Sequence, residues 1–246
     1  MSDLFSTQSV DYAAFRPSYP APFIEHLAGL APGRDLAWDC ATGNGQAAVQ
    51  LASHFARVLA TDASAAQLAN AAAHPRVTYC VAAEDASGAA DGSVDLVTVA
   101  QAAHWFDLRR FHAEVRRVLK PRGVIAIWCY GPVAVNDEID AVLQWFEFDR
   151  LRGFRAPELD HIHTAYRDLE FPFEEIPALS FSMTMTATRD QFLGFVSSWS
   201  AVASARAAGD DPIADLRARL TPIWSDAESR RALCPIGARM GRAASR

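Results

Sequence analysis

The sequence has few cysteines, no excess of positive charge and no long apolar run. Its four cysteines are scattered without a C-x-x-C pair, and three lie in apolar segments typical of strands, which predicts reduced, buried thiols and no disulfide framework. The net charge of −6 argues against a broad nucleic-acid surface. No apolar stretch approaches the roughly 18 residues that cross a bilayer, and the N-terminus lacks the basic and apolar blocks of a signal peptide. We therefore expect a soluble, cytoplasmic protein that binds neither nucleic acid nor membrane.

Half of the 246 residues are hydrophobic, which is enough for one large α/β domain. Strand-like and helix-like segments alternate from Leu36 to Tyr130, and this alternation predicts a mainly parallel sheet covered by helices. The expected strands cover residues 36–40, 57–62, 76–81, 94–100 and 124–130. The expected helices cover residues 47–55, 64–73 and 108–119.

Beyond Pro132 the alternation stops. We expect a helix over 136–152, an irregular segment over 153–175, a strand over 179–186, a helix capped by Thr188 that runs through Trp199, a helix over 212–224 and a weak strand over 230–240. Internal repeats and low-complexity linkers are missing from the sequence, so we expect a single domain. Its parts are an N-terminal helical arm (1–34), a cofactor-binding core (35–131), an inserted cap (132–178) and C-terminal strands and helices (179–246).

The segment from Ala37 to Asp62 predicts a nucleotide site. The Gly43-Asn44-Gly45 turn lets backbone approach a ligand closely, and Asp62 follows about 20 residues after the turn begins, as in cofactor sites that bind a ribose. Two interpretations stay open from the glycines alone. Read from Gly43, the turn fits the nicotinamide dinucleotide pattern G-x-G-x-x-A. Read from Asp39, it fits an acid-x-small-x-Gly-x-Gly pattern with an acid at the end of the first strand.

Acidic residues end three successive strands: Asp39, Asp62 and the pair Glu84-Asp85. Ligands of open α/β sheets bind at these carboxyl ends. Asp62 can accept from both ribose hydroxyls, Asp39 can orient the turn or face a ligand ammonium, and Asp85 can accept from an adenine amine. A nicotinamide enzyme has no particular use for the acid pair after the third strand.

The segment Gln101–Phe106 follows the fourth strand at the mouth of the expected crevice. His104 is a candidate general base, because an unperturbed imidazole has a pKa near 6.5. Trp105 and Phe106 either wall a ligand pocket or pack the next helix onto the sheet.

The cap contains histidines and several arginines. His161 and His163 could share one strand face, but no third ligand is evident and we expect no metal site. The arginines are either solvated or gathered over a pocket for a carboxylate-bearing substrate; they are Arg150, Arg152, Arg155 and Arg167.

Taken together, these motifs resemble class I S-adenosylmethionine-dependent methyltransferases. Within that superfamily, Y-A-A-F-R-P-S-Y-P (Tyr12–Pro20) and A-Q-A-A-H-W-F-D (Ala100–Asp107) resemble the trans-aconitate methyltransferase-like group, with weaker similarity through S-S-W-S-A-V (Ser197–Val202). Ala41 departs from the pattern, since many relatives carry glycine there; a methyl group is small enough that cofactor binding should survive.

The resemblance implies a doubly wound, Rossmann-like sheet of seven strands whose last strand is antiparallel, with S-adenosylmethionine as cofactor. It also implies an arm that closes over the cofactor through Tyr12, Arg16 and Tyr19. The expected cofactor contacts are Tyr12, Arg16, Asp39, Ala41, Thr42, Gly43, Gly45, Asp62, Ala63, Gln67, Ala83, Glu84, Asp85, Gln101 and Trp105. The candidate substrate contacts are Tyr19, His104, Arg150 and Arg155, with His104 as the catalytic candidate.

We therefore expect a monomer or homodimer that methylates a small molecule, of which a carboxylic acid is one candidate. Two alternatives are a nicotinamide-dependent oxidoreductase and a non-catalytic protein that binds the cofactor in the same fold.

Overall fold

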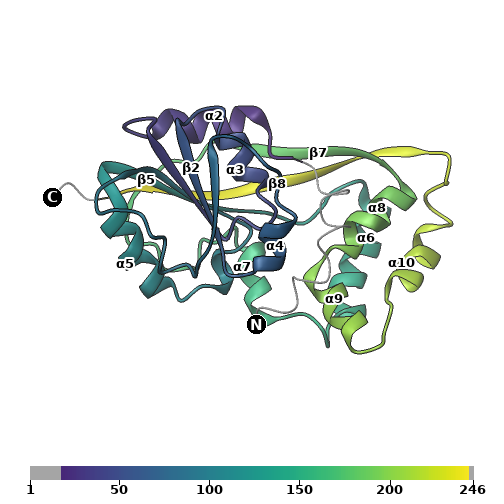
Figure 1. Ribbon diagram of the computed structural model, residues 1–246. Coiled ribbons are helices and arrows are strands. Elements are labelled where there is room, and N and C mark those ends of the chain that lie inside the picture. Colours follow the sequence, from purple (N-terminus) through teal and green to yellow (C-terminus); the bar gives the residue numbers. More distant parts are fainter. Residues whose placement is uncertain (1–17, 244–246) are drawn as a thin grey trace.

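The computed structural model describes residues 18–243 and shows a mixed sheet with helices on both faces (Figure 1). The strand order is β3-β2-β1-β4-β5-β8-β6, and β7 also pairs with β8. The strands are β1 (Leu36–Cys40), β2 (Arg57–Asp62), β3 (Val77–Val81), β4 (Val94–Ala100), β5 (Leu119–Tyr130), β6 (Glu174–Ile176), β7 (Phe181–Thr188) and β8 (Ser229–Arg242). The expected α/β class and the mainly parallel sheet are confirmed.

Strands β1 to β5 are parallel, and their order reverses between β1 and β4. The chain moves outward from β1 through β2 to β3 and then returns to the other side of β1. Helices leaving β1 and β4 therefore turn to opposite faces, which leaves a crevice at the carboxyl ends of these two strands. This reversal places the ligand site where the sequence predicts it.

The last strand, β8, runs antiparallel to β5, as expected. On its other edge, β8 pairs with β7 along residues 229–236 and with β6 along residues 240–242. The two strands thus share the last position of the sheet, which accounts for eight strands where seven were expected. Pro177 directly follows β6 and has no N–H to donate to a ladder, which explains why the pairing is interrupted there.

Two hydrophobic clusters hold helices to the sheet. On one face, α2 and α3 pack against residues such as Leu96, Ala126 and Trp128. On the opposite face, α5 packs Phe111 and Val115 against side chains of the central strands. The described helices are α2 (Ala21–Leu30), α3 (Gln46–Leu51), α4 (Ala65–Ala69), α5 (Leu108–Val118), α6 (Asp137–Trp145), α7 (Asp160–His163), α8 (Arg189–Ser197), α9 (Ser200–Ala207) and α10 (Ile213–Leu220), with short turns η1 (Ala103–Trp105), η2 (Phe146–Arg150) and η3 (Pro157–Leu159).

A helical lobe lies beyond one end of the sheet and contains α6, α8, α9 and α10 (Figure 1). The helix α10 packs against both α6 and α8. Strands β7 and β8 reach from the sheet to this lobe. The lobe therefore includes a second chain segment, α8 to α10, in addition to the segment after β5 that the sequence indicates as a cap.

Several sequence-based boundaries are wrong. The helix expected over 64–73 ends at Ala69. His161 and His163 lie in the short helix α7 and not on a strand. The helix α9 was not expected; it begins at Ser200, after Trp199 in an extended conformation. The helix expected from Thr188 through Trp199 is α8, which ends at Ser197. Its start is confirmed: Thr188 and Gln191 form a reciprocal capping box.

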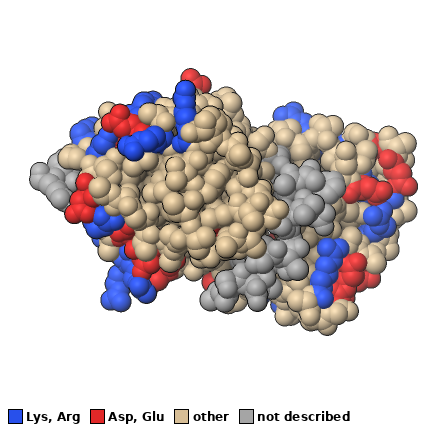
Figure 2. Space-filling model, viewed as in Figure 1, with Lys and Arg blue, Asp and Glu red and all other residues tan. Residues whose placement is uncertain are grey.

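Positive and negative side chains lie near one another toward the two ends of the face shown in Figure 2, and a wide tan area without charged side chains lies next to the charges at one end. No helix within residues 18–243 is both long enough and apolar enough to span a membrane.

Candidate active site

The turn after β1 contains backbone that favours glycine. Gly43 and Gly45 have φ angles of 59° and 84°, in the left-handed region where a side chain is strained. A Cβ on Gly45 would also collide with the Tyr79 hydroxyl. The turn therefore presents backbone atoms without side chains at the carboxyl end of β1.

Asp62 connects this turn to the end of β2. Its Oδ2 accepts a hydrogen bond from the Gly43 N–H at 2.9 Å, and its Oδ1 accepts one from the Ser64 N–H at 2.8 Å. A carboxylate oxygen has a second lone pair, so both oxygens can still accept from ligand hydroxyls.

Asp39 is completely buried below the turn. It accepts hydrogen bonds from the Thr42 hydroxyl at 2.5 Å and from the Thr98 hydroxyl at 2.7 Å. Burial raises the pKa of Asp39 to about 6, the charge of Asp62 adds to this rise, and the two hydroxyl donors oppose it. Of the two roles that the sequence leaves open for Asp39, these contacts favour orienting the turn through Thr42.

A first cavity, of about 450 Å³, lies at the carboxyl ends of the strands. Its volume is within the range of small-molecule sites. The structure brings together here many of the residues expected at the cofactor: Ala41, Gly43, Asp62, Ala63, Gln67, Glu84, Gln101 and Trp105. Ala41 adopts a left-handed φ of 52°, a conformation that glycine adopts without strain and that strains a side chain.

Other expected cofactor residues are close to the first cavity without lining it: Asp39, Thr42, Gly45, Ala83 and Asp85. Asp85 was expected to accept from an adenine amine, but it forms an ion pair with Arg110 at 2.5 Å. The neighbouring Glu84 lines the cavity instead. The structure therefore favours Glu84 over Asp85 as the acid at this end of the site.

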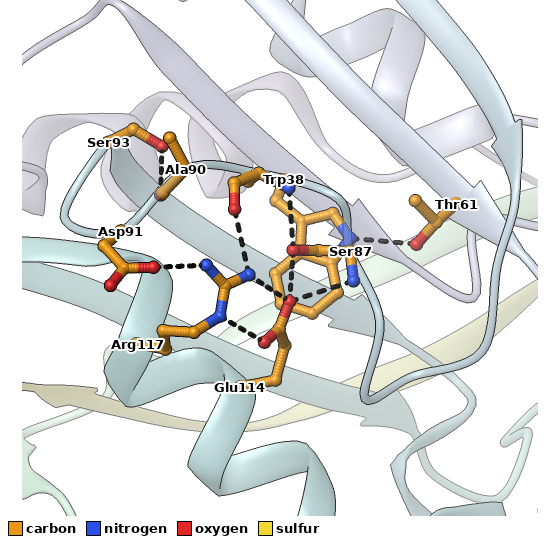
Figure 3. Close-up of polar contacts among 9 residues, drawn as sticks. Trp38, Thr61, Ser87, Ala90, Asp91, Ser93, Glu114 and Arg117 are labelled. Carbon is orange, nitrogen blue, oxygen red and sulfur yellow. Dashed lines mark hydrogen bonds and ion pairs between the residues drawn. The ribbon is translucent and has the colours of Figure 1, made fainter.

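A polar network fixes the loop that follows β3 (Figure 3). Glu114 of α5 accepts from the Ser87 N–H at 2.9 Å and from the Ser87 hydroxyl at 2.5 Å. Arg117 donates to Glu114 and, at 2.5 Å, to Asp91. The pKa of Glu114 is lowered, chiefly by its hydrogen bonds with Arg117. Because Glu84 belongs to this loop, the network also limits where its carboxylate can lie.

The helical lobe and the segment before α7 supply a wall of the first cavity that the sequence analysis missed. Its residues are Phe154, Ala156, Glu158, Ser200 and Ser204. Side chains of this segment face two different cavities, because Arg155 and Leu159 line a second cavity and not the first. The segment over 153–175 has no regular periodicity, so no sequence signal shows which side chains face a ligand.

The second cavity has a volume of about 150 Å³ and adjoins the first. Gln101, Trp105 and Ser200 line both cavities. Its walls are largely apolar and include Tyr130, Pro132, Val133, Leu151, Phe195 and Trp199; its polar lining includes His104, Glu147, Arg155 and His163.

His104 lines the second cavity and is only 7% exposed. Its Nδ1 lies 2.7 Å from the hydroxyl of the buried Tyr166. Burial, with a contribution from His161, lowers the pKa of His104 to about 4. The imidazole is therefore neutral at pH 7, so the structure favours a positioning role over a base that titrates between pH 6 and 7.

The two candidate substrate arginines separate in the structure. Arg150 donates to both carboxylate oxygens of Asp210 and to Asp215, and it lines neither cavity. The hypothesis that Arg150 contacts a substrate is thus not supported, because its donors connect η2 to α10 and the loop before it. Arg155 does line the second cavity.

Tyr19 is a core residue, packed edge-on against Trp128 at 5.3 Å between ring centroids. Its carbonyl accepts from Gln50 Nε2 at 2.7 Å, and it lines neither cavity. Tyr12 and Arg16 lie outside the described residues.

The cap histidines each face a carboxylate. His161 Nδ1 lies 2.9 Å from Asp168, and His163 Nε2 lies 2.9 Å from Glu147. Within residues 18–243, no group of three or more His, Cys, Asp or Glu side chains could hold a metal ion. The four cysteines are all free, and Cys80 is exposed while the other three are buried.

The reversed parallel sheet, the glycine turn and the acids at the strand ends define a class of cofactor-dependent α/β proteins. Comparison with known proteins narrows this class. A family model described as a methyltransferase domain matches residues 38–127. A candidate methyltransferase of Dictyostelium discoideum is 34% identical over 215 residues, which cover 86% of this chain and 82% of that protein.

The structure also resembles that of a candidate type II methyltransferase from Anaeromyxobacter dehalogenans. The TM-score is 0.86 at 42% identity, with 95% of this chain and 100% of that chain covered. CRG1 of Saccharomyces cerevisiae, a candidate S-adenosylmethionine-dependent methyltransferase, is 26% identical over 62% of this chain and 56% of its own length.

The chain belongs to the class I S-adenosylmethionine-dependent methyltransferases. It is an enzyme of that family, and its cofactor is S-adenosylmethionine. The methyltransferase interpretation of the acid–glycine pattern is confirmed, and the nicotinamide oxidoreductase alternative is set aside.

Proposed function

We propose that this methyltransferase acts on a small-molecule carboxylic acid and belongs to the trans-aconitate methyltransferase-like group. The group assignment is supported by the motifs Tyr12–Pro20 and Ala100–Asp107. One observation carries the substrate proposal: a second cavity, lined by the largely buried side chain of Arg155, adjoins the first cavity across Gln101 and Trp105. A guanidinium group is well suited to bind a carboxylate.

The first cavity is the proposed cofactor site, and its side chains fit this cofactor. Asp62 is positioned for the ribose hydroxyls, and Glu84 lies one strand further along the sheet. Asp62, Glu84 and Glu158 surround the cavity with negative charge, which suits a cofactor that carries a positive sulfonium. The glycine turn leaves room for the cofactor to approach the backbone.

S-adenosylmethionine supplies a methyl group that is already electrophilic, so the chain must chiefly align the acceptor and exclude water. The apolar walls of the second cavity exclude water from the acceptor. His104 offers a neutral imidazole to the acceptor. Because a carboxylate has no proton to lose before methylation, a histidine with a pKa near 4 is compatible with this role.

A methyl-transfer screen over small acids, alcohols and amines tests this proposal. Purified protein is incubated with cofactor labelled on the methyl group, and the label is followed into products by mass spectrometry. Labelled methyl esters are the expected products. Labelling of only alcohols or amines would contradict the carboxylate proposal and leave methyl transfer itself intact.

Three further expectations remain proposals. The arm closes over the cofactor through Tyr12 and Arg16, the chain is a monomer or homodimer, and it divides into an arm, a core, a cap and a C-terminal part at residues 34, 131 and 178. Hydrogen exchange over residues 9–20 tests the first of these, because closure requires protection to rise when cofactor is added.

A further inference from the structure

The size and walls of the second cavity limit what can bind there. Its volume of about 150 Å³ matches that of an apolar cavity that accepts one benzene ring. Tyr130, Phe195 and Trp199 supply aromatic walls, and Leu151 and Val133 add aliphatic surface. These walls favour a compact apolar body, either one ring or a short branched chain.

Arg155 carries the cavity's positive charge. Among the described residues that line the second cavity it is the one arginine or lysine, and its side chain is only 10% exposed. Its Nε faces Glu147 at 3.3 Å, and its Nη1 faces Asp160 at 2.5 Å. Its Nη2 is buried and has no hydrogen-bond partner among the described residues. A buried charged donor without an acceptor is costly, so a small shift that brings this guanidinium to a ligand oxygen is favoured.

The charges around Arg155 allow one additional anion and oppose several. Glu147 Oε1 already faces both Arg155 and His163. Asp160 is 68% exposed, so solvent screens much of its effect on the guanidinium. A single carboxylate can pair with the guanidinium, which lines the cavity. A second or third carboxylate would enter a largely apolar cavity beside Glu147, and the described lining offers it no second arginine or lysine to offset its desolvation.

We propose that the second cavity binds a ring-sized, apolar monocarboxylic acid, whose carboxylate pairs with the Arg155 guanidinium. This inference rests on the proposed function and specifies its substrate class. The inference predicts that the cavity prefers acids such as benzoate and phenylacetate to small polycarboxylic acids. Polycarboxylic acids also carry a carboxylate, but they lack an apolar ring.

Titration calorimetry tests the proposal on the full-length chain saturated with S-adenosylhomocysteine. The probes are benzoate, phenylacetate and tricarballylate, which carries three carboxylates on a short chain. We expect at least one ring acid to bind one per chain and roughly tenfold or more tightly than tricarballylate, the factor that corresponds to about 1.4 kcal/mol. Because a hydrogen bond to a charged group is lost, Arg155→Gln should weaken binding of that acid by roughly ten- to a hundredfold.

Two further variants test whether Arg155→Gln weakens binding through the lost guanidinium or through damage to the fold. Arg155→Lys keeps the positive charge and removes the guanidinium fork, so it should also weaken the ring acid. Arg152→Gln removes a guanidinium from the same segment that is 77% exposed and lines neither cavity, so it should change nothing. The affinity for S-adenosylhomocysteine and the thermal midpoint report whether each variant folds.

The outcomes separate this inference from the proposed function. Tricarballylate binding at least as tightly as the ring acids, or ring-acid affinity unchanged in the folded Arg155 variants, overturns the inference. So does the lack of any ring-acid binding. If the ring acids bind as expected but are not methylated when S-adenosylmethionine is supplied, the substrate proposal fails while the binding site stands.

Discussion

The Asp62 carboxylate and the Gly43 backbone N–H are joined by a hydrogen bond of 2.9 Å. The bond connects the end of β2 to the glycine turn after β1, and the same carboxylate lines the first cavity. Asp62 therefore has two functions in the proposed site. It holds the backbone that the cofactor approaches, and it offers oxygen lone pairs to ribose hydroxyls.

The first prediction concerns the contribution of the Asp62 carboxylate to cofactor binding. We expect Asp62→Ala to weaken S-adenosylmethionine and S-adenosylhomocysteine by roughly ten- to a hundredfold, because hydrogen bonds to a charged group are lost. Asp62→Asn keeps one acceptor oxygen and should weaken them less. Calorimetry on both variants measures the difference. Unchanged binding in Asp62→Ala would remove Asp62 from the cofactor site.

The centre of the sheet could be predicted from the sequence because β1 and β4 are buried on both faces. Largely apolar runs give β1 and β4 their observed bounds, and a glycine turn between β1 and β2 has few possible conformations. The acid at the end of β2 follows from the same geometry. In this part of the chain, the apolar sequence pattern predicts the same strands that the sheet buries.

The choice between adjacent residues could not be predicted. Glu84 and Asp85 are both acidic, and Asp85 forms an ion pair with Arg110 of α5 while Glu84 lines the cavity. Arg150 and Arg155 present the same difficulty, because the partners of Arg150 are 60 or more residues away. Contacts of this range leave no trace in a single sequence.

The second prediction concerns the pH dependence of cofactor binding. Burial raises the pKa of Asp39 to about 6, so Asp39 becomes negative as the pH rises through 6. A negative charge below the turn attracts a cationic cofactor. The affinity for S-adenosylmethionine should therefore increase between pH 5 and 7, and this increase should be smaller in Asp39→Asn. Equal pH profiles for the two proteins would contradict the assignment.

The third prediction follows from the left-handed conformation of Ala41. Ala41→Gly removes the strain of a side chain at positive φ, so the free energy of unfolding should stay level or rise by up to about 1 kcal/mol. Ala47→Gly is the matched comparison, since Ala47 is buried in α3; it should lower the free energy by about 1 kcal/mol or more. Urea denaturation measures both. Equal losses in the two variants would show that the turn does not strain Ala41.

The fourth prediction uses His104 as a reporter of burial. Its pKa is about 4 in the fold, below the 6.5 of an exposed imidazole. The unfolded chain therefore binds more protons between pH 4 and 6.5, and this group destabilises the fold as the pH falls through that range. In His104→Gln this contribution is lost. We therefore compare the free energy of unfolding of the unmodified protein with that of the variant by urea denaturation. The value for the unmodified protein minus the value for the variant should be larger at pH 7 than at pH 4.5, by up to about 3 kcal/mol. A difference that does not change with pH would contradict the burial of this imidazole.

The last prediction concerns Glu158, which lines the first cavity from η3. A carboxylate facing the cavity attracts the sulfonium of S-adenosylmethionine and gains less from the neutral thioether of S-adenosylhomocysteine. One such interaction across the cavity contributes about 1 kcal/mol, or a factor of about five in affinity. Glu158→Gln should therefore weaken S-adenosylmethionine by roughly that factor and leave S-adenosylhomocysteine nearly unchanged.

Glu138→Gln is the matched control, because Glu138 is exposed on α6 and lines neither cavity. It makes the same change in net charge and should leave both affinities unchanged. Parallel calorimetric titrations of the two ligands give the ratio of their dissociation constants for each protein. If Glu158→Gln weakens both ligands equally, Glu158 binds a part that they share, such as the ribose or adenine. If neither affinity changes, Glu158 does not contact the cofactor, and Asp62 and Glu84 supply the negative charge of the site.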